Sequence, residues 1–376
     1  ASVTLICDGS NFHIISHENV AIEQNAIENA SFTVDQYGHV TRSGLQNSSL
    51  GIQDRWFYMG GASPPAIWTY SNESNGGTDA KSKWGKWLCT TGGSPDATDH
   101  ASIRQTIIGN NGSGFLGTDG LFENAVLSMD VIGHLNTPDA PYVLALGVKT
   151  LQGTARQYIG HVTITADAVW QRVSLVIPED SVADIDPGTG VDWHISVGLI
   201  GGSSRLATAN TWENNVANVS NTSGSQNWGA TANNYLGITN VVLAPSQIPP
   251  SYESVSRTYE EELEICKYYF EKRINSNTYS PLATSFNRST TIAAGFYGYT
   301  EKRVAPTIAF SGATEFGVTH GASADTQTSA VTAEEIHPTG CRVKFTVGSG
   351  LTAGEGSLLA NWNNTSAYIT ISAEGF

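Results

Sequence analysis

Charged residues are scarce in this sequence. They make up 14% of the 376 residues, against about 25% in an average globular domain, and the net charge is −15. Because Lys and Arg form no basic stripe that could contact phosphates, we expect no nucleic-acid partner. The abundant aromatic residues argue against disorder. The surface is therefore expected to consist mainly of neutral polar groups.

Long hydrophobic runs are also missing. No stretch approaches the ~18 apolar residues that cross a bilayer, so we expect no membrane insertion. Residues 1–12 contain no basic segment followed by an apolar run, and therefore do not resemble a secretion signal. We expect synthesis in a cytoplasm.

Cysteine is rare, and its spacing fits neither a disulfide framework nor a metal site. The four cysteines lie far apart in the sequence, at Cys7, Cys89, Cys266 and Cys341. No pair has the short spacing of metal ligands, so buried free thiols are expected.

Period-two alternation of apolar and polar residues runs through most of the chain. In residues 191–199, Trp193 and Ile195 share one predicted face, while His194 lies on the other. Such alternation predicts half-buried antiparallel strands, and a two-sheet sandwich follows. His194 is expected to be solvated or paired across the strand rather than catalytic. Further strands are predicted at 125–132, 142–148, 158–165, 171–177, 235–243, 292–299, 307–310, 341–347 and 367–373.

One segment has helical spacing instead. Residues 258–261 (TYEE) form a capping box, three glutamates follow the cap, and Lys272 and Arg273 lie in the last predicted turn. Acidic residues at the start and basic residues at the end suit the helix dipole. The pattern predicts one amphipathic helix over 259–273, preceded by a proline-containing linker.

The strand at 235–243 (YLGITNVVL) and the helical segment 259–272 (YEEELEICKYYFEK) resemble a module of bacteriophage and prophage tail-fibre-type proteins. In that family, a carbohydrate-binding-like jelly roll ends in such a strand, and a helix follows directly. Further positions agree in order, at 53–57, 103–105, 303–307 and 367–374. The resemblance spans about residues 30–376, and a Trp-rich stretch between about 62 and 100 looks inserted.

The resemblance refines the predicted fold class. We expect a mainly β protein, with an antiparallel β-sandwich of the jelly-roll type, one amphipathic α-helix and a smaller C-terminal β domain. The domain boundaries are an N-terminal arm or first strand over 1–29, the jelly roll over 30–248, the linker and helix over 249–275, and a C-terminal β-sandwich over 276–376.

The resemblance also implies a function. It implies a virion surface protein of the fibre or spike type, made in the cytoplasm of a bacterial host. Its partners would be other virion proteins and a host cell-surface glycan, and it would be a homo-oligomer, commonly a trimer. A head-decoration, head-fibre or adaptor protein without glycan binding is the alternative, and a capsule depolymerase is the second alternative.

The Trp-rich stretch is the leading candidate for glycan contact. Trp68, Tyr70, Trp84 and Trp87 are interleaved with polar residues, and three of the eight lysines, Lys81, Lys83 and Lys86, lie there too. Aromatic rings stack on the C–H faces of sugars, while amides and charges bind the hydroxyls. A second patch contains Trp212 and Trp228. The alternative for both patches is packing in the core or contact between subunits.

No catalytic residue can be assigned. Glycoside hydrolysis needs two carboxylates at a defined separation, and the 34 acidic residues offer no basis for choosing a pair. The family's shared residues are structural, so we expect no enzymatic activity.

One acidic loop is a weak candidate for calcium. Asp184, Asp186 and Asp192 surround a glycine-rich turn, and Ca²⁺ is bound by six to eight oxygens. A turn in which Asp side chains cap backbone groups is the alternative. No other cofactor is expected.

Overall fold

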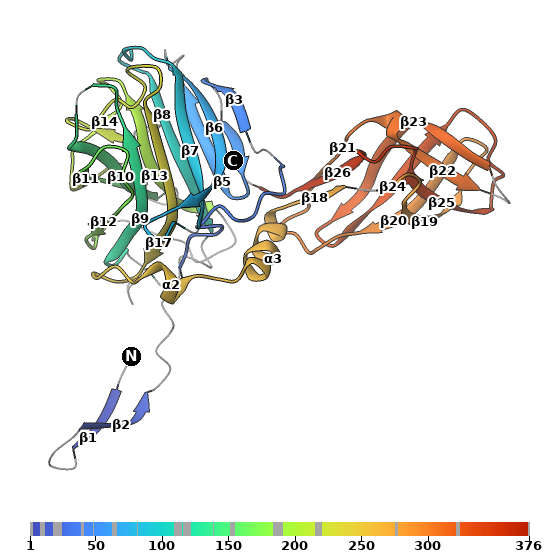
Figure 1. Ribbon diagram of the computed structural model, residues 1–376. Coiled ribbons are helices and arrows are strands. Elements are labelled where there is room, and N and C mark those ends of the chain that lie inside the picture. The colour runs from blue at the N-terminus through green and yellow to red at the C-terminus, as the bar shows by residue number, and fades with distance from the viewer. Residues whose placement is uncertain are drawn as a thin grey trace. The chain divides into compact units, whose positions relative to one another are not determined.

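The computed structural model divides the chain into two compact units, Ala1–Tyr259 and Glu260–Phe376 (Figure 1). The division falls inside the segment 249–275 that was predicted as linker and helix. The structure describes residues 3–7, 12–17, 25–38, 41–47, 49–61, 66–80, 82–108, 115, 122–137, 139–150, 155–182, 191–214, 220–274, 277–320 and 324–374.

The first unit is a sandwich of two antiparallel sheets. One sheet has seven strands in the order β15-β11-β10-β13-β8-β5-β4, and the other has six in the order β12-β9-β17-β7-β6-β3. The seven strands are β15 (Thr211–Asn214), β11 (Arg156–Ile164), β10 (Tyr142–Thr150), β13 (Val191–Gly201), β8 (His100–Ile108), β5 (Trp56–Gly61) and β4 (Ser49–Gln53). The six strands are β12 (Gln171–Ile177), β9 (Ala125–His134), β17 (Tyr235–Ala244), β7 (Ser82–Thr91), β6 (Ile67–Gly76) and β3 (Thr41–Leu45).

Alternation along the strands builds the core of this unit. On β13, Trp193, Ile195 and Val197 are fully buried between the sheets, as period-two patterning requires. The predicted two-sheet sandwich is confirmed.

Three smaller elements complete the first unit. β1 (Val3–Cys7) and β2 (Phe12–His17) form an antiparallel pair near the N-terminus. β14 (Leu206–Ala207) and β16 (Asn221–Thr222) form a short parallel pair. The helix α2 (Tyr252–Val255) begins at Ser251, whose side chain accepts a hydrogen bond from the backbone N–H of Ser254; such a cap satisfies an otherwise unpaired donor.

The second unit begins with the helix α3 (Tyr259–Tyr269). The helix ends four residues earlier than predicted, because β18 (Phe270–Ile274) starts there and pairs with β26 (Tyr368–Ser372). Lys272 and Arg273 therefore lie on a strand, and not in the last helical turn. Of the first-turn glutamates, Glu262 is buried.

The remainder of the second unit is a closed barrel, and not the predicted β-sandwich. Six strands close in the order β19-β20-β24-β23-β22-β25. They are β19 (Pro281–Asn287), β20 (Ile292–Gly298), β24 (Gly340–Val347), β23 (Ala324–His337), β22 (Phe316–His320) and β25 (Gly356–Asn361). A three-stranded sheet, β18-β26-β21 with β21 at Thr307–Phe310, and the 3-10 helix η2 (Ala313–Glu315) accompany the barrel. Closure removes exposed sheet edges that would otherwise pair with other chains.

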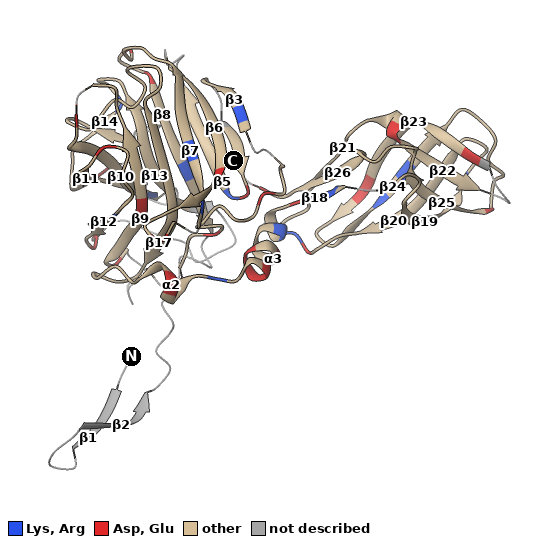
Figure 2. Cartoon of the chain, in the orientation of Figure 1, with Lys and Arg blue, Asp and Glu red and all other residues tan. Residues whose placement is uncertain are grey.

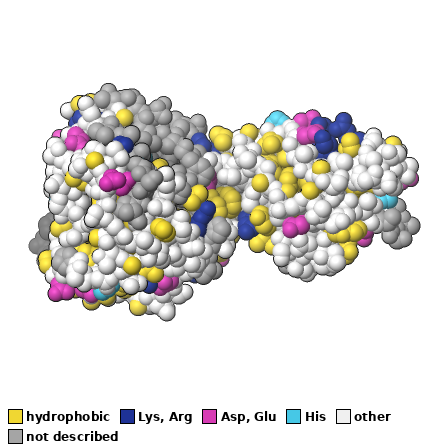
Figure 3. Space-filling view, turned by 90° about the horizontal axis from the view of Figure 1, so that it is seen from above, with side chains coloured by type: hydrophobic (Ala, Val, Ile, Leu, Met, Phe, Trp, Pro, Cys, Tyr) yellow, Lys and Arg dark blue, Asp and Glu magenta, His cyan; other side chains and the backbone are white. Residues whose placement is uncertain are grey.

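Charged side chains are sparse on both units (Figure 2). Neutral polar side chains and backbone form most of the face seen in Figure 3. No helix in the described part of the chain is long and apolar enough to span a membrane. Cys89, Cys266 and Cys341 are buried.

Candidate functional site

The Trp-rich stretch is not an exposed loop, and most of its aromatic rings cannot stack on a sugar. It forms the hairpin of β6 and β7 in the six-stranded sheet. Trp68, Tyr70 and Trp87 are fully buried in the core of the first unit. Trp87 contacts the rings of Phe32 and Tyr70. The spacing of these residues already indicated a shared buried face. Trp68 and Tyr70 are two residues apart, and alternate side chains of a strand lie on the same face.

Two side chains of the same hairpin, Trp84 and Lys86, lie on its outward side, because they alternate along β7 with the buried Trp87. Trp84 is 8% exposed, because its ring packs edge-to-face on Trp170 with centroids 5.2 Å apart. Lys86 lies 4.9 Å from the centroid of the Tyr235 ring. Lys83 is exposed. The hairpin therefore leaves little aromatic surface for a ligand.

The second aromatic patch is also part of the packing. Trp228 is fully buried and contacts Tyr142. Trp212 is half-buried, and its indole N–H donates to the carbonyl oxygen of Pro178 at 2.9 Å. The packing alternative therefore holds for the aromatic rings of both patches, apart from the partly exposed edge of Trp212.

The calcium candidate cannot be placed. Asp184 and Asp186 lie outside the described residues, and Asp192 lies on β13 with a side chain that the structure does not describe. Within the described ranges, no group of three or more His, Cys, Asp or Glu side chains could hold a metal ion.

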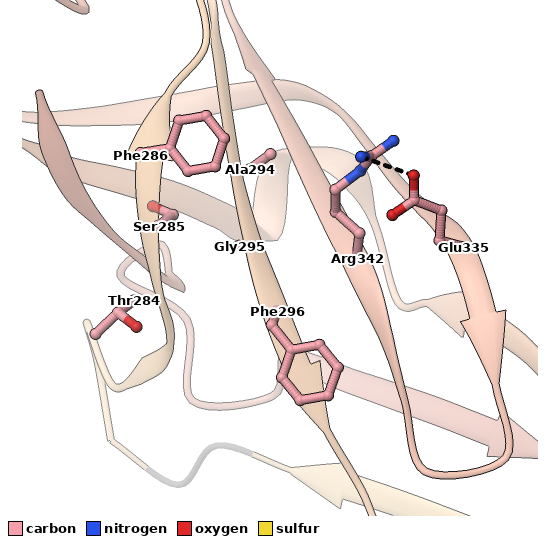
Figure 4. Close-up of a pocket in the computed structure, with 8 residues that line it drawn as sticks. All are labelled: Thr284, Ser285, Phe286, Ala294, Gly295, Phe296, Glu335 and Arg342. Carbon is pink, nitrogen blue, oxygen red and sulfur yellow. Dashed lines mark ion pairs between the residues drawn. The ribbon is translucent and has the colours of Figure 1, made fainter. Parts of the chain in front are cut away.

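An exposed aromatic groove lies on the outside of the C-terminal barrel, across β19, β20, β24 and the end of β23. Its volume is about 390 Å³, which falls in the size range of small-ligand sites. The residues that line it are Thr284, Ser285, Phe286, Ala294, Gly295, Phe296, Glu335 and Arg342. Figure 4 places the two phenylalanine rings at opposite ends of the groove, with Ala294 and Gly295 between them.

The two rings are unusually exposed for phenylalanine. Phe296 is 70% exposed and Phe286 is 54% exposed, although large apolar side chains are usually buried. Gly340 makes room for one of them, since a Cβ built at Gly340 would lie 2.4 Å from Cζ of Phe296. Small residues thus leave the two ring faces open at this site.

Arg342 and Glu335 form the polar side of the groove (Figure 4). Nη1 of Arg342 lies 2.8 Å from Oε1 of Glu335, and Nη2 donates to Oε2 of Glu334 at 2.8 Å. Lys344 extends the network, with Nζ 2.5 Å from Oε1 of Glu334. The guanidinium group is therefore held in place by two carboxylates.

A β-bulge directs Glu335 toward the groove. The pairing of β23 with β24 shifts by one residue between Glu334 and His337, and Glu335 has a φ of 51°. Left-handed backbone at a residue other than glycine is uncommon, and bulges often reorient a side chain next to a binding site. The bulge allows successive glutamates to contact the same arginine.

The ion pairs shift the pKa values of their members. Hydrogen bonds from Lys344 and then Arg342 lower the pKa of Glu334 to about 2. The hydrogen bond to Glu334 raises the pKa of Arg342. Both side chains stay charged at neutral pH, so the groove combines two apolar faces with a fixed guanidinium and a carboxylate.

Only a weak signal for this groove is present in the amino-acid sequence. Phe296 alternates with the buried Tyr297 on β20, and alternation alone does not say which of two neighbouring aromatic residues faces outward. The positions of Gly340 and of the bulge in β23 become informative only when the strands are paired.

No protein-family model matches the sequence, and no curated protein matches it. Several solved structures are similar to part of the chain. An enzymatically active domain of tailspike protein 4 from bacteriophage CBA120 is 11% identical over 58% of this chain, with a TM-score of 0.31. A structure titled "CBM4 structure and function" is 14% identical over 58% of this chain and 99% of its own, with a TM-score of 0.30.

A third similar structure holds the CBM22-1 and GH10 modules of a Clostridium thermocellum xylanase in complex with xylohexaose. It is 11% identical over 52% of this chain, with a TM-score of 0.29. The chain spans 21% of the tailspike chain and 27% of the xylanase chain.

Proposed function

We propose that the protein binds carbohydrate non-covalently in the groove between Phe286 and Phe296. The observation that carries this proposal is the pair of exposed rings on either side of a small-residue floor. Sugars present C–H faces that stack on aromatic rings. The guanidinium of Arg342 and the carboxylate of Glu335 can bind hydroxyls beside those faces, which is the usual combination of apolar walls and few polar groups.

We further propose that the protein is a virion surface component of the fibre or spike type. The resemblance of 235–272 to phage tail-fibre-type proteins supports this role, and so does the low-charge, β-rich surface. A single shallow groove would bind weakly, because it encloses only part of a ligand. In a homo-oligomer, commonly a trimer, several grooves acting together raise the overall affinity by 10²–10⁴-fold.

The experiment is a binding measurement on the full chain with a glycan array or intact host cells. Phe296→Ala should weaken binding by about fivefold, since an aromatic stacking contact is worth ~1 kcal/mol and about 1.4 kcal/mol is a factor of ten. Gly340→Ala should weaken binding as well, because the added methyl group displaces the Phe296 ring. Val304→Ala removes an apolar side chain that is 41% exposed and does not line the groove, and it should bind like the wild type.

Unchanged binding in both Phe296→Ala and Gly340→Ala would place any sugar site elsewhere. Absence of saturable binding by the wild-type chain would favour the structural alternative, a head-decoration, head-fibre or adaptor protein. The same exposed rings favour that alternative, because another virion protein could cover them. Electron microscopy of labelled particles would then locate the protein on head or tail.

The depolymerase alternative has a separate test. Glu335 is the one carboxylate among the residues lining the groove, and glycoside hydrolysis generally uses a pair. We therefore propose binding without hydrolysis. Release of reducing ends from a host polysaccharide by the full chain would overturn that part of the proposal.

A further inference from the structure

The polar wall of the aromatic groove carries four charged side chains that balance one another. Two are basic, Arg342 and Lys344 on β24, and two are acidic, Glu334 and Glu335 on β23. The guanidinium of Arg342 contacts both carboxylates at 2.8 Å, and the ammonium of Lys344 contacts Glu334. The wall therefore has no net charge.

The most exposed charge of this wall is negative. The side chain of Glu335 is 60% exposed, whereas that of Arg342 is 33% exposed. Glu334 and Lys344 are 31% and 28% exposed. Figure 4 shows the carboxylate of Glu335 on the side of the guanidinium that faces away from both phenylalanine rings. A ligand with a carboxylate, sulfate or phosphate group would have to approach Glu335 or displace it from Arg342, and juxtaposed like charges oppose binding.

The other polar side chains of the groove are neutral. Thr284 and Ser285 line it and supply hydroxyl groups, and Oγ of Ser285 shares a hydrogen bond of 2.7 Å with Oγ of Ser357. A neutral hydroxyl both donates and accepts hydrogen bonds, so it can pair with the hydroxyls of a sugar. Neither side chain offers a positive charge to an anionic group.

The groove opens where two strands separate. β19 pairs with β25 over most of its length, and β20 pairs with β24 along its whole length. Among the described residues 281–298, pairing between β19 and β20 is confined to Phe286 with Ala294 and Asn287 with Ala293. The strands then diverge, and Phe296 lies apart from Phe286 at the other end of the groove (Figure 4). Such a groove can hold consecutive sugar units, one on each ring.

We infer that the groove selects an uncharged segment of a glycan chain, at least two units long, and that Glu335 excludes units carrying a carboxylate, sulfate or phosphate group. The inference rests on the carbohydrate binding proposed above, and it adds the class of sugar. Phe286 and Phe296 stack on consecutive units, and Arg342 holds Glu335 in place, where its carboxylate accepts a hydrogen bond from a hydroxyl. The net charge of −15 acts in the same direction, because it repels acidic polymers at low salt.

The test is a binding measurement of the full chain on a glycan array. The array carries neutral, uronic-acid-containing and sulfated oligosaccharides, together with the corresponding monosaccharides. The wild type should bind neutral oligosaccharides, bind their monosaccharides more weakly, and leave the acidic glycans unbound. Because the ligand forms no ion pair, its affinity should change by less than about twofold between about 50 and about 500 mM NaCl.

Two substitutions of glutamate test the role assigned to Glu335. Glu335→Gln should raise the ratio of acidic to neutral binding by roughly tenfold, since it removes a like charge and frees the guanidinium of Arg342 for the ligand. Its binding of neutral oligosaccharides should weaken, because an amide oxygen is a poorer acceptor than a carboxylate. Glu301→Gln removes an exposed carboxylate of the same unit that does not line the groove, and it should keep the wild-type preference.

The outcomes separate this inference from the proposed function. Wild-type binding of acidic oligosaccharides that Phe296→Ala weakens would overturn the inference and leave the carbohydrate site in place. An unchanged preference in Glu335→Gln, or an equal shift in Glu301→Gln, would do the same. Binding that Phe296→Ala and Gly340→Ala leave intact, or no saturable binding to any glycan on the array, would overturn the site itself and the inference with it.

Discussion

In the first unit the large aromatic side chains are enclosed between two sheets, whereas in the second unit two phenylalanines lie on the outside of a barrel. Trp68, Trp87 and Trp228 are fully buried, while Phe286 and Phe296 expose more than half of their surface. Aromatic side chains therefore stabilise the core of the first unit, whereas in the second unit two of them are exposed at the surface where we propose recognition. Burial, and not residue type, separates the two roles.

Buried charge differs between the units in a similar way. In the second unit, the fully buried ammonium of Lys302 lies 2.9 Å from a carboxylate oxygen of Glu271. In the first unit, Lys149 lies beside Arg104 and His194. An ion pair offsets part of the cost of burying a charge, whereas neighbouring like charges add to it. The comparison contrasts a buried lysine held by a carboxylate in the second unit with a cluster of buried basic side chains in the first.

The comparison of aromatic residues gives the largest expected effect. Trp87→Ala should lower the free energy of unfolding of the first unit by about 3–5 kcal/mol, because it leaves a cavity in a close-packed core. Phe296→Ala should change the unfolding of the second unit little, because most of that ring is already in water. Denaturant unfolding followed by circular dichroism measures both. A loss of stability in Phe296→Ala as large as that in Trp87→Ala would contradict the assignment of Phe296 to a recognition surface.

The comparison of buried lysines predicts a pH dependence of intermediate size. The pKa of Lys149 is about 6 in the folded chain, against about 10.4 in an unfolded chain. Between these values the unfolded state holds a proton that the folded state lacks, so the first unit should gain stability as the pH rises from about 6 to about 10, and lose it as the pH falls. Lys149 contributes at most about 1.4 kcal/mol per pH unit.

Lys149→Met should remove this contribution, and thermal unfolding between pH 6 and 9 in NaCl measures the change in slope. Lys267→Met is the matched control and should keep the wild-type slope. Parallel stability profiles for Lys149→Met and the wild type would show that Lys149 is not forced to release its proton on folding.

The smallest expected effect concerns the partly exposed ion pairs beside the groove. The pKa of Glu334 is lowered to about 2, so its pairs with Lys344 and Arg342 should contribute stability above about pH 4 and lose it as the pH falls toward 2. Because these side chains are each about one-third exposed, solvent screens them, and Glu334→Gln should destabilise the second unit only slightly. Thermal unfolding between pH 2 and 5 should show the two stability curves converging at the acid end. A difference that persists at pH 2 would show that Glu334 acts through packing, and not through charge.

Much of the fold could be predicted from local patterns. The alternation along 191–199 predicted β13 and identified its buried face, because side chains of a strand alternate by geometry alone. The capping box located the start of α3. The predicted end of the helix was wrong by four residues. The helical pattern continues to Arg273, but Phe270 pairs with Ser372 in a strand instead.

The candidate sites could not be predicted in the same way. Density of Trp and Lys in the sequence suggested a sugar-binding loop at 68–87, yet β6 and β7 pair inside a sheet that a second sheet covers. The buried basic cluster joins Arg104, Lys149 and His194, which are 45 residues apart along the chain at each step, and strand pairing alone makes them neighbours. The groove at Phe296 depends on Gly340, whose strand follows a long intervening segment.

The sequence by itself determined that this chain is β-rich and poor in charge, with one amphipathic helix between two β regions. These properties follow from the composition and from the spacing of apolar residues, which repeats every two residues in a strand and every 3.6 residues in a helix. Both signals lie within a single strand or helix. Only the tertiary structure decided which aromatic rings meet solvent and which basic groups are buried together. Burial depends on what covers a strand face, and that covering comes from residues far away in the sequence.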